Sequence, residues 1–338
     1  MQVNELSTKF DPKISIIRVC AMLSIIIGHW LSMQKINHFQ FGAIGVEIFL
    51  FISGYLYSDK CIDNIKKWII NRCNILLFPY WVVLVGNILC RLCFGYEVTL
   101  TAIIVFFLNL QGIDRVFRKI PCPILTGMGQ TWFLSVLMIC YIIMLLFKKK
   151  PIIEKQIRTH IKFYFVGTVL LQISLSLFSI QIIRPLCFFY GYFFDRNKLN
   201  MSAKKYSILT MLLILLTVIR FITHISFDGS ILYDYIVFGW SFVILAIWLI
   251  VTSIKIMTFV PGIIAKITNS KFWRILDLMT YPLFLTHYMF TSGELAINKW
   301  IDNLIGQILV FVVLICITAF VVLFVTDNKT LKKIIADN

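Results

Sequence analysis

The sequence lacks any polar stretch long enough to form a soluble domain of its own. Acidic residues are scarce, with 16 Asp and Glu among 338 residues, and charged residues make up only 14%. Gly-x-Gly-x-x-Gly, Walker and zinc-protease patterns are absent, which argues against an ATP-driven machine or a soluble-cofactor enzyme. We therefore expect a single domain over residues 1–338, without a metal site.

Apolar residues make up 59% of the chain, and apolar runs of about 20 residues recur from end to end, which is typical of a multi-pass helical membrane protein. The 32 Lys and Arg lie in short clusters between these runs, where they set membrane orientation, and we expect no nucleic-acid partner. The first run has no small-residue cleavage site, so we expect it to remain as a membrane helix. Cys90 and Cys93 form C-x-x-C inside an apolar run, which favours packing over redox chemistry.

Hydropathy and loop charge predict about ten crossings, with both termini in the cytoplasm, in the cell (inner) membrane. The segment at about 99–112 is too short to cross and is expected to be re-entrant or interfacial. One predicted outer loop, about 113–127, breaks the charge rule because it carries Arg115, Arg118 and Lys119. The predicted spans are about 14–33, 41–58, 73–95, 128–147, 161–179, 182–195, 206–224, 232–254, 275–293 and 303–326.

The first predicted span carries two ionisable residues, Arg18 and His29. Such a residue costs about 2.5–3.5 kcal/mol to insert, so it usually faces the protein interior and has a function there. Their spacing is close to a whole number of helical turns, which places both on one face, about 16 Å apart along the axis. This face therefore carries a cation near the inner end and an imidazole in the outer half.

The neighbouring spans place other ionisable residues near His29. Glu47 enters the second span from outside at a similar depth, and Gly42 and Gly45 would let the two helices approach closely. We expect Glu47 to orient the His29 ring, since a carboxylate fixes the tautomer of an imidazole. His287, in the span at about 275–293, is expected at the same depth.

A donor of suitable shape would connect the two ends of this face. Arg72 opens the third span on the inner side, next to Arg18, and arginine forks suit phosphate oxygens. Coenzyme A has phosphates at one end and a thioester about 15–20 Å away along a thin arm, a length that matches the helix rise. We expect Arg18 and Arg72 to bind an acyl-CoA and His29 to act as general base or acyl carrier.

Several motifs recur along nearly the whole chain in a fixed order. They are Arg18 and His29 with ten residues between them, GVEIFLFISGYL, Arg72 ahead of Pro79-Tyr80-Trp81, TWFLSVLMICY and LMTYPLFLTHY. In these motifs the sequence resembles the acyltransferase-3 family of multi-pass membrane acyltransferases. The chain departs from the family in two places: Lys66 and Lys67 stand where a second arginine is common, and Glu47 stands where Asp is more common.

The resemblance implies transfer of an acyl group, commonly acetyl from acetyl-CoA, to a hydroxyl of a cell-surface or lipid-linked carbohydrate, with Arg18 and His29 essential. Toward the acceptor we expect substrate contacts from Trp132, Tyr281 and His287, because a tryptophan in this position could stack on a sugar ring. Near the outer side, Arg91 and Arg184 could contact an anionic acceptor.

The sequence therefore predicts an integral-membrane O-acyltransferase. Its catalytic residues are His29 and Glu47, and its acyl-CoA ligands are Arg18 and Arg72. Its partners are acyl-CoA, a carbohydrate acceptor and membrane lipid. Two alternatives stay open. One is a transporter or flippase for lipid-linked sugar that uses these residues as a proton relay. The other is a partner in polysaccharide export that has no catalytic activity.

Overall fold

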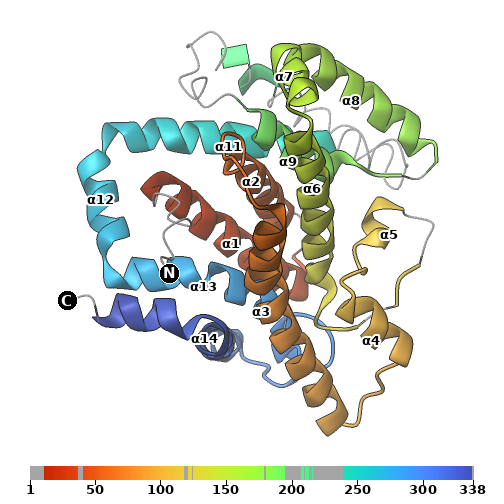
Figure 1. Ribbon diagram of the computed structural model, residues 1–338. Helices are drawn as coiled ribbons and strands as arrows, with labels where there is room; N and C mark the ends of the chain where they lie inside the picture. Colours follow the sequence, from red (N-terminus) through yellow and green to blue (C-terminus); the bar gives the residue numbers. More distant parts are fainter. Residues whose placement is uncertain are drawn as a thin grey trace.

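The computed structural model describes residues 11–36, 41–117, 121–123, 125–178, 180–194 and 239–336, with positions 207, 208, 210–212 and 215 (Figure 1). Over these ranges the chain is helical, and its β pairing is one isolated bridge between Phe117 and Ile180. The α-helices are α1 (Pro12–Met33), α2 (Phe41–Tyr55), α3 (Ile65–Cys93), α4 (Leu100–Phe107), α5 (Ile113–Val116), α6 (Trp132–Lys149), α7 (Pro151–Thr159), α8 (Ile161–Ser176), α9 (Ile183–Phe193), α11 (Gly239–Phe259), α12 (Pro261–Asn269), α13 (Lys271–Thr286) and α14 (Leu304–Ala336). Three 3-10 turns are η1 (Gly129–Thr131), η4 (His287–Phe290) and η5 (Ile297–Lys299).

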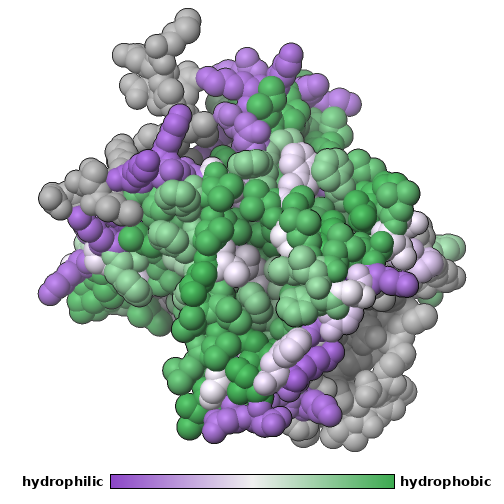
Figure 2. Space-filling model, turned by 90° about the horizontal axis from the view of Figure 1, so that it is seen from below, coloured by the Kyte–Doolittle hydropathy of each residue, from purple (hydrophilic) through white to green (hydrophobic). Residues whose placement is uncertain are grey.

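Five of the described helical segments are long and apolar enough to cross a membrane. They are Pro12–Met33, Ile65–Cys93, Gly129–Lys149, Phe242–Phe259 and Leu304–Lys332. Figure 2 shows a broad band of apolar side chains with hydrophilic residues at its margins, as expected for a protein surrounded by lipid. The chain is therefore an all-helical membrane protein.

The predicted count of ten crossings is not reached by the described helices. Helix α2 has 15 residues, α8 has 16, α9 has 11 and α13 has 16. The predicted span at about 206–224 lies largely outside the described residues. Helix α4, with 8 residues, is about 12 Å long and too short to cross, as expected for that segment.

Helix α1 begins where its sequence contains strong start signals. The Asp11 side chain accepts hydrogen bonds from the backbone N–H groups of Lys13 and Ile14, and Pro12 occupies the first turn, where a missing N–H costs nothing. Helix α2 packs closely on α1 at Gly45, where the missing side chain leaves room for the α1 backbone. A Cβ atom at this position would overlap the Ala21 carbonyl oxygen. The close approach of these two helices was predicted from the glycines.

A second close contact joins α2 to α9. A Cβ atom on Gly54 would overlap the Phe188 carbonyl oxygen, and one on Gly191 would overlap the Phe51 carbonyl oxygen. Helix α2 therefore lies between α1 and α9 and uses a different face for each. This division decides where the side chains of α2 point.

Polar contacts show which helix ends lie together. The Trp273 indole donates to Ser15 Oγ at 2.9 Å, which joins the starts of α13 and α1. The Arg158 guanidinium donates to the Ser58 carbonyl at 2.7 Å, which joins α7 to the segment after α2. We call this side the basic end of the bundle. It carries the starts of α1, α3 and α13 and the last turns of α2 and α6.

The other side, which we call the opposite end, carries the ends of α1 and α3 and the starts of α6 and α14. There the Gln34 side-chain amide donates a hydrogen bond to Gln307 Oε1, and Arg91 forms an ion pair with Glu294 at 2.6 Å. These relative directions agree with the alternation of the predicted spans. Arg18 thus lies toward the basic end and His29 toward the opposite end of the same helix.

Candidate functional site

A cavity of about 280 Å³ opens at the basic end between α1, α2, α3, α6 and α13. Its cationic lining comes from Arg18, Lys60 and Arg72. Phe133 and Phe284 form part of its wall on the side toward the opposite end, because they lie at the start of α6 and near the end of α13. The two arginines that the sequence expected side by side therefore line one cavity.

Arg18 is oriented by an acid on α13. Its Nε donates to Asp277 Oδ1 at 3.0 Å, and its Nη2 pairs with Asp277 Oδ2. This two-point contact uses one edge of the guanidinium, so the N–H groups of Nη1 stay available to a ligand. Asp277 lies within the predicted span at about 275–293, and the sequence did not predict that it pairs with Arg18. Its pairing with Arg18 depends on the α1–α13 contact.

Arg72 has aromatic neighbours instead of an acid. Its guanidinium carbon lies 5.2 Å from the centre of the Tyr57 ring and 5.7 Å from that of Trp68. Its Nε is buried and, among the residues that the structure describes, has no hydrogen-bond partner. Burial of a cationic donor without a partner is costly. The surroundings of Arg72 Nε therefore favour an anionic ligand at this position.

His29 lies beside a second histidine at the opposite end. Its ring centre is 5.3 Å from that of His287 and 4.7 Å from that of Tyr288, which meets it edge-on. His287 is fully buried, and its Nδ1 lies 3.0 Å from the Leu283 carbonyl oxygen. Because a carbonyl only accepts, Nδ1 carries the proton and Nε2 presents a lone pair. Within the described chain, Nε2 has no partner.

The expected pair of His29 and Glu47 is not formed, so this prediction was wrong. Glu47 is buried, and its Oε1 lies 3.4 Å from Nε of Arg184 on α9. In the described part of the chain, no hydrogen bond joins Glu47 to His29. The Cys187 thiol also donates to the Glu47 carbonyl at 3.3 Å, which ties this turn of α2 to α9.

Helix geometry explains the error. At 100° per residue, position 47 is about 200° from Gly45, which faces α1, and about 20° from Gly54, which faces α9. The Glu47 side chain therefore points away from the first helix. The prediction relied on a similar depth of the two residues in the membrane. Depth does not determine the side of α2 from which the Glu47 side chain projects. The glycine spacing in GVEIFLFISG contained that information.

Trp132 lies at the start of α6, toward the opposite end where the acceptor was expected, whereas Tyr281 lies on the side of the arginines. The Arg184 guanidinium covers one face of the Trp132 ring at 4.1 Å, so that face does not stack on a sugar. Tyr281 lines the cavity with Arg18 and donates its hydroxyl to the Leu76 carbonyl at 2.7 Å. Tyr281 thus belongs to the arginine side of the bundle. His287, one of the three predicted acceptor contacts, lies against His29.

Of the remaining basic candidates, Arg91 lies apart from the cavity. The buried Arg91 binds Glu294 and Thr126 and donates to the Glu97 carbonyl at 3.3 Å, which makes it part of the scaffold. Arg118 and Lys119 lie outside the described residues, as does the side chain of Arg115.

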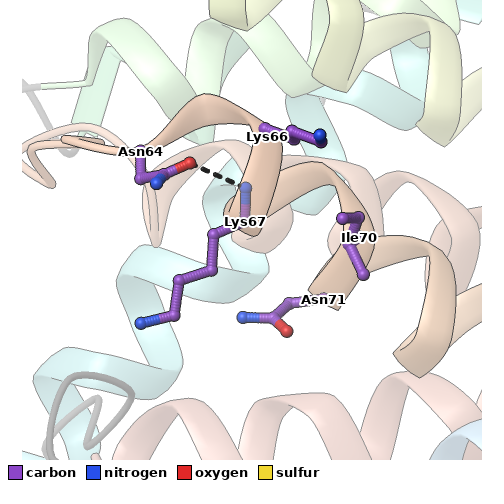
Figure 3. Close-up of a pocket in the computed structure, with 5 residues that line it drawn as sticks. All are labelled: Asn64, Lys66, Lys67, Ile70 and Asn71. Atoms are coloured by element: carbon purple, nitrogen blue, oxygen red, sulfur yellow. Dashed lines mark hydrogen bonds between the residues drawn. The ribbon is translucent and has the colours of Figure 1, made fainter.

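Lys66 and Lys67, which replace the expected second arginine, border a separate surface hollow of about 230 Å³ at the start of α3. Figure 3 shows Lys66 pointing away from Lys67 and Asn71. The Asn64 side chain accepts a hydrogen bond from the Lys67 backbone N–H at 2.9 Å. Both lysines are exposed.

The cavity stops short of His29, which is not among its lining residues in the described chain. Phe284 stands between the two sites, since it lines the cavity and its ring centre lies 6.1 Å from that of His287. The sequence expected a donor arm to run from the arginines to the imidazole. In this structure an aromatic side chain interrupts that path.

Comparison with known proteins gives one match. A family model described as an acyltransferase domain matches residues 11–327, a range that contains both arginines, both histidines and every helix that lines the cavity. No curated protein and no solved structure matches the chain.

Proposed function

The chain belongs to the acyltransferase-3 family and is a membrane acyltransferase; on this premise we propose that it moves a short acyl group, acetyl, from acyl-CoA to a hydroxyl of a cell-surface or lipid-linked carbohydrate. One observation carries the proposal. Arg18 and Arg72 line one cavity at the basic end, and the His29–His287 pair lies beyond its aromatic side. The basic end is then the cytoplasmic side, where acyl-CoA is available.

The donor phosphates bind at the two arginines. Arg72 has no acidic partner among the described residues, so a phosphate would supply the counter-charge and accept from its buried Nε. Asp277 holds Arg18 at the cavity edge with its Nη1 donors still available. The pantetheine arm then points from the arginines toward Phe284 and the histidines.

His29 acts as the general base. It takes the proton of the acceptor hydroxyl while that oxygen attacks the thioester carbonyl; the tetrahedral intermediate collapses with cleavage of the C–S bond, and the imidazolium returns its proton to the CoA thiolate. His287 replaces Glu47 as the orienting partner. Its Nε2 has no partner in the described chain, and the two ring centres lie 5.3 Å apart. When the rings turn toward each other, the Nε2 lone pair accepts a hydrogen bond from one His29 nitrogen, which leaves the other nitrogen as the base.

The proposal is tested with membranes that contain the full chain or its His29→Ala variant, supplied with acetyl-CoA labelled in the acetyl group. We expect the wild type to release CoA and to label a glycan, and the variant to lose about 10²–10⁴-fold in rate. A transporter would give proton-coupled sugar flux without CoA release. A non-catalytic export partner would leave the glycan chemically identical in both samples. Either result would overturn the proposal.

A further inference from the structure

Two phenylalanines, Phe133 of α6 and Phe284 of α13, form what we call the aromatic wall of the cavity. Both are buried, and their ring centres lie 5.4 Å apart in an edge-to-face arrangement with an interplanar angle of 68°. Phe49 of α2 extends the packing, with its ring centre 6.3 Å from that of Phe133. Edge-to-face rings at this spacing attract each other, so the wall is a packed element of the fold.

The wall separates the two halves of the site. Phe284 lies three residues before His287, which puts both on the same side of the last turn of α13. Its ring faces the cavity on one side and lies 6.1 Å from the His287 ring on the other. A group that moves from the arginines to His29 therefore meets Phe284 immediately before the histidine pair.

The acyl group is the leading end of a donor whose phosphates are held at the basic end, by Arg18 and Arg72. We propose that Phe133 and Phe284 determine the length of the acyl group that the enzyme transfers. This inference rests on the proposed function. A short acyl group passes when the Phe284 ring turns about its side-chain torsions, whereas each further methylene must find space between two rings that are already in contact. The wall therefore favours the smallest acyl groups.

The experiment compares rates for acetyl-, butyryl- and hexanoyl-CoA, followed by release of the CoA thiol from membranes that contain the full chain. The variants are Phe284→Ala, Phe133→Ala and the milder Phe284→Leu. The matched control is Phe51→Ala, which removes an equally buried ring that packs on Phe194 between α2 and α9, away from the cavity lining. Thermal unfolding in detergent checks that each variant is folded.

Phe284→Ala is expected to raise the ratio of hexanoyl to acetyl rates by about tenfold or more, since the fit of a single methylene can change a rate by that factor. Phe284→Leu should fall between Phe284→Ala and the wild type, and Phe51→Ala should keep the wild-type ratio. A folded Phe284→Ala or Phe284→Leu protein with the wild-type ratio would overturn the inference. A wild type that releases no thiol from any acyl-CoA would instead defeat the proposed function, so the two failures are distinguishable.

Discussion

Arg18 and Asp277, 259 residues apart in sequence, form a two-point ion pair across the contact between α1 and α13. The acid has two roles that can be separated: it helps to hold the helices together, and it fixes the guanidinium at the cavity edge. In the proposed function the arginine has a further role, which is binding of the acyl donor.

We expect Arg18→Gln and Asp277→Asn to lower the free energy of unfolding by about 1.5 kcal/mol each, the lower range for a charged hydrogen bond, because the Arg18 side chain is partly exposed. Only Arg18→Gln should weaken CoA binding. Asp277→Asn removes a negative charge next to the proposed phosphate site and leaves the N–H groups of Arg18 in place. Thermal unfolding and calorimetric titration with CoA measure the two effects. Unchanged CoA affinity in Arg18→Gln would make this arginine purely structural.

Arg72→Gln should raise the KM for acyl-CoA by about 10- to 100-fold with a smaller change in kcat, since a charged hydrogen bond is worth about 1.5–3 kcal/mol and each 1.4 kcal/mol is a factor of ten. The matched control is Lys66→Gln with Lys67→Gln. These lysines lie one to two turns earlier on α3 and border a separate hollow, so their loss should leave KM unchanged. Equal effects would point to a general electrostatic attraction of CoA to the basic end.

The two nitrogens of His287 can be tested separately. His287→Asn keeps an N–H near the Nδ1 position for the Leu283 carbonyl but loses the Nε2 acceptor, whereas His287→Gln places an amide near Nε2. We expect His287→Asn to lower kcat by about 10²-fold with little change in the KM for acyl-CoA, and His287→Gln to recover part of that loss. The pH profile of kcat should change shape in His287→Asn only. Equal activity of the two variants would assign His287 to packing.

Glu47 is expected to act on stability and not on proton transfer. Its carboxylate is buried against Arg184, so Glu47→Ala should cost about 3–5 kcal/mol of unfolding free energy because a buried charge loses its partner. The double variant with Arg184→Ala should be less destabilised than the sum of the single variants. Turnover per folded molecule should stay close to wild type. A loss of turnover in a stable Glu47→Gln protein would restore its assignment as the partner of His29.

Acid sensitivity is expected at the opposite end, in the turn after η4. Burial raises the pKa of Glu294, but the hydrogen bond from Thr126 and the charge of Arg91 outweigh burial, and the net pKa is lowered. A carboxyl with a lowered folded-state pKa adds stability above its unfolded pKa, and that stability is lost as the pH falls through the folded value. The unfolding temperature of Glu294→Gln should therefore fall less between neutral and acidic pH than that of the wild type. Parallel curves would contradict this assignment.

Local sequence signals predicted some contacts correctly and others not. The ten-residue spacing between Arg18 and His29 placed the two on one helix, and Arg72 was correctly expected near Arg18, because α3 starts where α2 has just ended. Span direction alone brought His287 to the depth of His29. Depth was insufficient for Glu47, since residues at one depth can lie on opposite faces of a helix. Tyr281, six residues before His287, lies instead on the side of the arginines.

The sequence by itself determined that this chain is an all-helical membrane protein of the acyltransferase-3 family, because hydropathy, charge clusters and motif spacing are local properties of the polypeptide. Only the tertiary structure decided the partners: Asp277 for Arg18, His287 for His29, and Arg184 for Glu47. The physical reason is close packing. Gly45 and Gly54 commit opposite faces of α2 to α1 and α9, and every side chain between them follows from that choice.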